Sequence, residues 1–243
     1  MEMSKYLSRA DLERIGGTVV NQYYRAIAPQ GTLPAPVDPV KLAKVVLGLE
    51  THYLPLSGDG SILGMACFQD TMLEVYDFDG NPFQVELTGR DIVIDCSLLE
   101  DGKLGRHNFT AAHELAHHIL VRLYPEDYRS LLNCRTHILY RDTRRSRDWV
   151  EWQADTMASV LIMPEGTIQN CMEMFGLGRK LDMLSSVCRA KEFERFCDMA
   201  AYLGVSKKAL AIRMKQLGVL GEEYLANPTA PMDIWKDEGE DDG

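Results

Sequence analysis

The sequence predicts an α+β fold: a small, mostly antiparallel sheet packed on a pair of helices, followed by a C-terminal helical segment. Two observations predict this fold. Residues 49–96 contain short apolar runs that are typical of strands, and after Gly105 the apolar residues recur about every 3.6 positions, which indicates helices. The order helix, strands, helices favours a sheet with the later helices segregated on one side.

Two helices are expected before the sheet. Residues 12–28 have helical periodicity, although Gly16 and Gly17 interrupt it. A second helix is predicted over residues 38–47, because Asp38 can cap the first turn and a proline follows at the first helical position. Its apolar stripe comprises Leu42, Val45 and Val46, and its stop signal is Gly48.

Five strands are predicted, and the chain after them is expected to be helical. The strand runs cover residues 49–54, 62–68, 72–78, 83–87 and 91–96. An Asp-Gly-Asn-Pro turn at residues 79–82 predicts that the third and fourth runs form a hairpin. From Gly105 the helical period continues to the end of the chain, apart from loops around Pro125, Pro164 and Asn227.

Composition and charge narrow the function classes. The net charge of the 243 residues is −10, and residues 233–243, with six acids and one lysine, supply −5 of it. We therefore expect a disordered acidic tail and a nearly balanced body, which argues against a protein that mainly coats nucleic acid. The longest uncharged stretch, residues 26–37, is shorter than the roughly 20 residues of a membrane helix. With a charged N-terminus, we expect a cytoplasmic protein without a membrane partner.

These signals divide the chain into four predicted parts. An N-terminal helix and a proline-rich linker occupy residues 1–35, and a core follows at residues 36–165. A helical, helix-turn-helix-like segment is expected at residues 166–226, and the acidic tail at residues 227–243.

An HExxH motif lies in the first predicted helix after the sheet. At about 100° per residue, His113 and His117 are one turn and about 40° apart, so both imidazoles can reach one metal ion. Glu114 lies on the flank of that face, where a carboxylate can act as a general base. His118 lies beside Glu114, and we expect it to be a polar neighbour of the metal ligands or an aid in proton transfer. The motif therefore predicts a catalytic metal site.

A catalytic zinc ion takes three protein ligands and keeps one position for water. Metzincins place their third ligand just after the motif, but Leu120 and Leu123 stand at the required positions here. A second helix that ends at Pro164 carries Glu151 and Asp155 four residues apart on one face. Glu151 could bind the ion while Asp155 orients a ligand imidazole through a hydrogen bond. The spacing alone also fits a solvated helix face.

The two motif segments together resemble the ImmA/IrrE metallopeptidases, zinc proteases of bacteria and phages with a compact gluzincin-like core. The resemblance rests on Arg106-x-x-Phe-Thr-x-Ala-His-Glu-Leu-Ala-His and Glu151-Trp-Gln-Ala-Asp-x-x-Ala-x-x-Leu-Ile-Met-Pro, and it runs from Pro36 to Leu220. It implies that the zinc ligands are His113, His117 and Glu151, and that Glu114 is the catalytic carboxylate. Asp155 departs from the pattern, because many of these proteins have asparagine or another small polar residue there.

The C-terminal segment carries a second candidate site. Residues 197–218 read as a helix, a tight turn and a second helix that Ser206 can cap. The second helix carries the cations Lys207, Lys208, Arg213 and Lys215. These side chains could contact DNA phosphates or dock a substrate protein, and we favour packing or docking over DNA binding.

Two functions are weighed on this basis. The favoured one is a cytoplasmic zinc endopeptidase, with manganese as a second metal that such a site can take. The resemblance implies a helix-turn-helix transcriptional repressor as the protein substrate, whose cleavage derepresses stress or mobile-element genes. The alternative is a DNA-binding regulator with a structural or silent metal site. Against it, structural zinc usually takes four protein ligands, and no cysteine lies near the motif.

Overall fold

The computed structural model describes residues 6–28, 36–57, 59–77, 80–133, 136–140 and 149–221, with the backbone alone for residue 133 and residues 136–140. These residues form an α+β fold with two compact units, the first of which runs to Ile162 and the second from Met163. The predicted fold class is confirmed. The predicted domain limits stay predictions, and the acidic tail lies outside the described residues.

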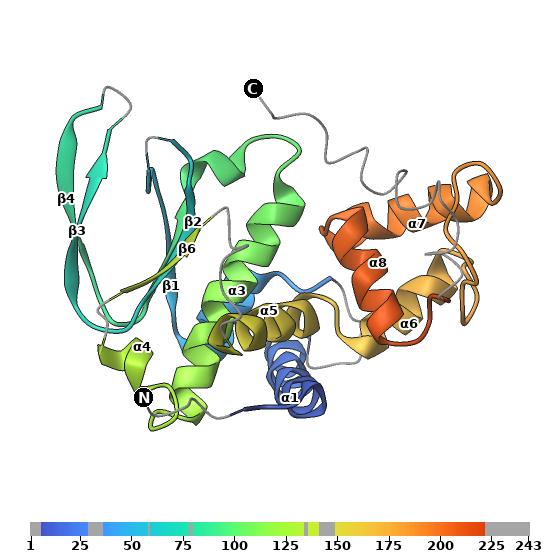
Figure 1. Ribbon diagram of the computed structural model, residues 1–243, viewed down its shortest axis with the longest axis horizontal. Helices are drawn as coiled ribbons and strands as arrows, with labels where there is room; N and C mark the ends of the chain where they lie inside the picture. Colours follow the sequence, from blue (N-terminus) through green and yellow to red (C-terminus); the bar gives the residue numbers. More distant parts are fainter. Residues whose placement is uncertain are drawn as a thin grey trace. The chain divides into compact units, whose positions relative to one another are not determined.

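Within the described residues, the first unit contains a four-stranded sheet and a two-stranded sheet (Figure 1). The strands are β1 (Glu50–Leu54), β2 (Ile62–Cys67), β3 (Thr71–Tyr76), β4 (Pro82–Leu87), β5 (Asp91–Asp95) and β6 (Thr136–Tyr140). The larger sheet has the order β1-β5-β2-β6, in which β1 is parallel to β5 and the other pairs are antiparallel. The five predicted runs are all strands, and β3 pairs with β4 as the predicted hairpin requires.

Strand β6 contradicts the prediction that the chain after Gly105 is helical apart from its loops. Its sequence has the β-branched and aromatic residues that favour strands, but it lies inside a region of helical period. The hydrogen bonds that make it a strand come from β2, far earlier in the chain, which local periodicity does not show. Residues 175–189 are also not helical, and within them Gly176 and Gly178 adopt φ angles of 67° and 72°.

The second predicted helix is present, but its second half is wound more widely than an α-helix. It consists of α2 (Pro39–Leu42) and the π-helix η1 (Ala43–Leu47), and it ends as predicted at Gly48, whose φ is 68°. A π-helix has i→i+5 hydrogen bonds and turns less per residue, so the expected apolar stripe breaks at this point. Leu42 is buried, whereas Val45 is 42% exposed, and the prediction for Val45 is wrong.

The core of the first unit lies where helices and sheet meet. Helices α3 (Leu104–Leu123) and α5 (Trp149–Ile162) pack against each other, and α3 also packs against β2 and β5 (Figure 1). Two shorter helices, η2 (Cys96–Leu99) and α4 (Arg129–Asn133), precede and follow α3. The buried aliphatic residues of α3 and α5 join those of the sheet in one continuous hydrophobic cluster.

Helix α1 (Arg9–Ile27) belongs to this core and packs on α5. It begins with a capping box, in which Ser8 and Asp11 each accept a hydrogen bond from the other's backbone. An ideal Cβ on Gly16 would lie 2.6 Å from Val160 Cγ1 of α5. The glycine that weakens the helical pattern of the sequence is therefore the residue that lets the two helices approach closely.

The second unit is helical in its described part. It contains α6 (Glu165–Met174), α7 (Ala190–Leu203) and α8 (Lys207–Gln216). Gly204 ends α7 with a φ of 64°, and Ser206 caps α8 by accepting a hydrogen bond from the backbone nitrogen three residues later, Ala209 N. Of the helices described in either unit, none is long and apolar enough to cross a membrane.

The two adjacent glycines of α1 give opposite predictions. We expect Gly16→Ala to destabilise the protein by about 1–3 kcal/mol, because its methyl group overlaps the buried Val160. We expect Gly17→Ala to stabilise it by about 0.5–1 kcal/mol, because nothing lies within 4 Å of the added carbon and alanine favours a helix. Denaturant unfolding of both variants measures the difference, and changes of the same sign would contradict the packing of α1 on α5.

Candidate metal centre

The candidate metal centre begins in the middle of α3. Every residue from Thr110 to Val121 is buried, because the sheet covers one side of this helix and α5 another. His113 and His117 are both fully buried, and their ring centroids lie 4.7 Å apart. Polar nitrogen atoms in such a place need partners, since an unpaired buried polar group is costly.

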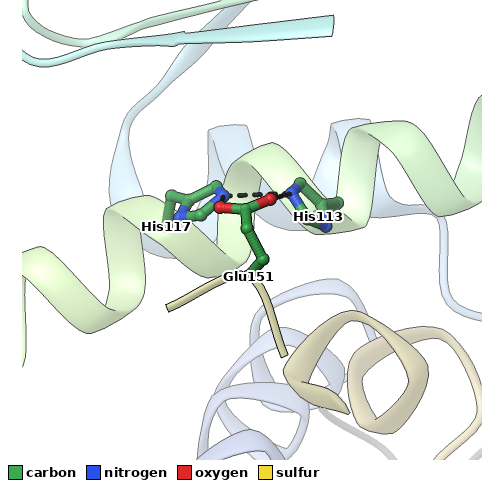
Figure 2. Close-up of side chains that lie close together, drawn as sticks. All are labelled: His113, His117 and Glu151. Atoms are coloured by element: carbon green, nitrogen blue, oxygen red, sulfur yellow. Dashed lines mark hydrogen bonds and ion pairs between the residues drawn. The ribbon is translucent and has the colours of Figure 1, made fainter. Parts of the chain in front are cut away.

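Glu151, in the first turn of α5, reaches the same place (Figure 2). One carboxylate oxygen lies 3.3 Å from His113 Nε2, the other lies 3.4 Å from His117 Nε2, and the two Nε2 atoms are 3.0 Å apart. The Glu151 side chain is 20% exposed, whereas the imidazoles are 1% and 0% exposed. Three donor groups from two helices therefore converge, and the carboxylate is the one that solvent reaches.

The donor set and its spacing fit a tetrahedral zinc ion. Ligands about 2.0–2.1 Å from zinc in this geometry are about 3.3 Å from one another. The three separations between His113, His117 and Glu151 lie between 3.0 and 3.4 Å. Two imidazole nitrogens and one carboxylate are also a ligand set that catalytic zinc uses, with a fourth position left for water.

The surroundings of the donor atoms are negative. Burial lowers the pKa of His113, but the hydrogen bonds to Asp155 and Glu151 and the nearby charge of Glu114 outweigh it and raise this pKa to about 10. The position of His113 therefore favours a positive charge. A divalent cation supplies such a charge, so the electrostatics agree with the geometry.

Asp155 lies one turn after Glu151 on α5 and contacts the other nitrogen of His113. His113 Nδ1 donates a hydrogen bond to Asp155 Oδ1 at 2.9 Å. Because the proton is on Nδ1, the lone pair of Nε2 is available for a cation, and Nε2 is the atom that faces Glu151. The Asp155 side chain is 54% exposed, so this hydrogen bond lies at the edge of the site.

Glu114 is fully buried next to His113 in α3. Its side chain reaches strand β2, where it lies against Gly64. Burial, Asp91 and Glu114 together raise the pKa of the Cys67 thiol on the same strand to about 12. The Glu114 carboxylate thus lies on the sheet side of α3, whereas Glu151 approaches from α5.

The structure does not bring His118 to the three donor groups. Its ring packs against Phe68, with centroids 5.0 Å apart, and its other contact is with Asp91. Burial, which the Asp91 backbone and charge only partly offset, lowers the pKa of His118 to about 4 and keeps the ring neutral. Among the described residues, the partners of His118 therefore belong to the region of the sheet.

A residue that the sequence did not single out holds the first turn of α5. Gln153 is fully buried, its Oε1 accepts a hydrogen bond from Leu7 N at 2.8 Å, and its Nε2 donates one to Trp149 O at 3.0 Å. Because Glu151 lies between these two α5 residues, the same bonds fix the turn that presents it. In the sequence, a glutamine two residues after a candidate ligand does not indicate this role, because the role becomes apparent only when its burial is known.

The C-terminal cations divide into one buried and three partly exposed side chains. Arg213 is fully buried, and its Nε donates a hydrogen bond to Met163 O at 2.9 Å. The prediction that Arg213 serves in docking is therefore wrong: it shares the buried face of α8 with Leu210 and Met214, three residues before it and one after. The three other cations, all partly exposed, are Lys207, Lys208 and Lys215.

Removing the Asp155 carboxylate is expected to weaken zinc binding. Asp155→Ala should lower the zinc affinity by about 10–100-fold, because His113 loses the hydrogen bond that fixes its ring. Asp155→Asn should lower it less, since the amide oxygen can accept the same bond. Competition with a chelating dye measures both affinities, and a parental affinity in the alanine variant would contradict this role.

Comparison with known families gives a match to the motif region. The family model described as the IrrE N-terminal-like domain, Peptidase_M78, matches residues 97–215. The matched range contains α3 and α5, and so all three candidate ligands and Glu114. No curated protein matches the chain. Residues 97–215 are therefore similar to the IrrE N-terminal-like domain of peptidases, in agreement with the resemblance of the two motif helices to the ImmA/IrrE metallopeptidases.

Proposed function

We propose that this protein is a zinc-dependent endopeptidase that hydrolyses a peptide bond in a protein substrate. The observation that carries the proposal is the convergence of His113, His117 and Glu151 within ligand distance of one another, with Glu114 buried beside them. The family match supports peptidase activity and covers all four residues. The same donor set can hold manganese, whose occupancy depends on its availability as well as on affinity.

Each of these side chains has a distinct part in the proposed reaction. A zinc ion held by His113, His117 and Glu151 would polarise a water molecule and lower its pKa to about 7. Glu114 accepts the proton of that water and later delivers it to the departing amine. Asp155 holds His113 in the tautomer that presents Nε2. Burial of the imidazoles and of Glu114 keeps bulk water away, which strengthens their interactions with developing charge.

We propose a helix-turn-helix transcriptional repressor as the substrate, whose cleavage releases stress or mobile-element genes. The support is the resemblance of the motif helices to the ImmA/IrrE metallopeptidases. The partly exposed Lys207, Lys208 and Lys215 of α8 are proposed to dock this partner, and DNA binding by the same helix is the less favoured role.

Metal content tests the ligand set. We expect His117→Ala and Glu151→Ala to lose their zinc after dialysis, because two remaining donors hold the ion weakly. The matched control is His107→Ala, since His107 lies in the same helix but contacts Tyr53 and Asn108. Elemental analysis by mass spectrometry gives the zinc per chain. Zinc retained in full by Glu151→Ala would place the third ligand elsewhere.

Glu114→Gln tests proteolysis itself. The substitution keeps the shape of the side chain and leaves the zinc ligands in place, but it removes the base. We therefore expect full zinc content and at least a ~100-fold loss of cleavage. Parent and variant are incubated with soluble cell extract, new N-termini are labelled, and fragments of a helix-turn-helix repressor should arise with the parent alone.

Cleavage at the parental level by Glu114→Gln would reject the proposed mechanism. If the parent cleaves nothing and Lys207→Ala with Lys208→Ala abolishes salt-sensitive retention on DNA, the protein is a DNA-binding regulator instead. Under the proposed function, these two lysine substitutions leave the rate at which a bound peptide bond is hydrolysed unchanged.

A further inference from the structure

Strand β2 carries a glycine where it packs against α3. An ideal Cβ on Gly64 would lie 2.6 Å from Thr110 Cγ2, 2.9 Å from Glu114 Oε1 and 3.2 Å from Glu114 Cγ. Carbon atoms in favourable contact are about 3.5–4.0 Å apart. A side chain at position 64 therefore requires a neighbouring group to move. A glycine inside a strand is often found where another part of the chain approaches closely.

The two residues that face Gly64 share one side of α3. Thr110 and Glu114 are four residues apart, so they lie one above the other, and they are 1% and 0% exposed. His113, one residue before Glu114, is turned toward Glu151 of α5 instead. The motif helix thus presents its carboxylate to the sheet and its imidazoles to α5.

The backbone of Gly64 is held from both sides. Gly64 pairs with Ile94 of β5, and on the other side it pairs with Leu139 of β6. The register between β2 and β6 shifts between Ile62 and Gly64, which places an irregularity directly beside the glycine. A strand bonded on both sides moves away from a helix only by breaking hydrogen bonds, so an added side chain would displace the helix side chains.

Of the two groups in contact, the Glu114 carboxylate is the more easily displaced. Thr110 is β-branched, and its Cγ2 position is set by a single stiff torsion. Glu114 has three side-chain torsions, and the nearer of its two contacting atoms, Oε1, is at the end of its side chain. A methyl group on residue 64 therefore costs the fold little at Glu114 but moves its carboxylate.

We propose that Gly64 is a positioning residue for Glu114. The absence of a side chain leaves space on β2 that the Glu114 carboxylate occupies, beside His113 and against the strand. The inference rests on the proposed function, in which Glu114 accepts a proton. It extends that function because the residue that positions the base lies on a strand, outside the motif helices and outside residues 97–215.

The test is Gly64→Ala in the full chain, with Gly17→Ala as a control whose added carbon meets nothing within 4 Å. The kinetics are measured on a substrate that the parent cleaves and the Glu114→Gln variant does not. We expect kcat of Gly64→Ala to fall by about 100-fold, while KM and zinc content stay at parental values. A parental kcat would overturn the inference and leave the proposed function standing.

A second substitution separates the position of Glu114 from packing. Thr110→Ser removes the carbon atom at 2.6 Å and leaves the contact with Glu114. In combination with Gly64→Ala it should recover lost stability but not kcat. Recovery of kcat would overturn the inference, since the loss would then come from packing at Thr110. If Gly64→Ala alone does not fold, the double variant is used in its place. A parental kcat in the double variant would likewise overturn the inference.

Cobalt(II) gives a readout that does not depend on turnover. The visible absorption of the cobalt-loaded chain is titrated with pH, and its inflection should shift in Gly64→Ala in the direction found for Glu114→Gln, but not in Gly17→Ala. If the parent cleaves nothing, the proposed function has failed. The titration then decides the role of Gly64 by itself, and an unshifted inflection in Gly64→Ala would reject that role. A parent that binds neither zinc nor cobalt overturns both proposals.

Discussion

The packing of α3 against α5 is the contact on which the site depends. It brings two imidazoles from one helix and a carboxylate from the other to separations of 3.0–3.4 Å. Burying these groups costs free energy unless each one has a partner of suitable charge. The burial of apolar residues around them offsets that free energy, since both helices bury their aliphatic side chains in one continuous cluster.

The remaining elements of the first unit hold these two helices from other sides. Helix α1 packs closely on α5 at Gly16, and Leu7 donates to Gln153 in the turn that presents Glu151. The four-stranded sheet lies against α3 at Gly64, where the carboxylate of Glu114 meets the strand. Each of the functional side chains is therefore placed by a contact from an element outside the HExxH motif.

Much of the fold and the centre of the site could be predicted from the sequence, because both follow from local spacing. Strands of period two, and histidines one turn apart on a helix, are properties of a few neighbouring residues. Glu151 and Asp155 were candidates because of their spacing and the need of zinc for a third ligand, and the resemblance to the ImmA/IrrE metallopeptidases favoured Glu151 as that ligand. The structure brings both of them to His113.

What the sequence did not predict depends on partners that are distant in the chain. Strand β6 exists because β2 pairs with it, and Val45 is exposed because the helix widens after Leu42. Counting charges on α8 grouped Arg213 with the lysines, although its position on the helix face is that of a buried residue. Gly64 was hidden in the same way, since nothing in a strand pattern tells which side chain of a helix will lie against it.

The hydrogen bond between Leu7 and Gln153 joins residues 146 positions apart. The HExxH helix alone supplies two of the three donors of the candidate metal centre. The third donor comes with α5, and the same turn of α5 binds Leu7 through Gln153. The candidate centre is therefore complete only when the first unit has folded, with the segment before α1 docked on the helix that carries the carboxylate.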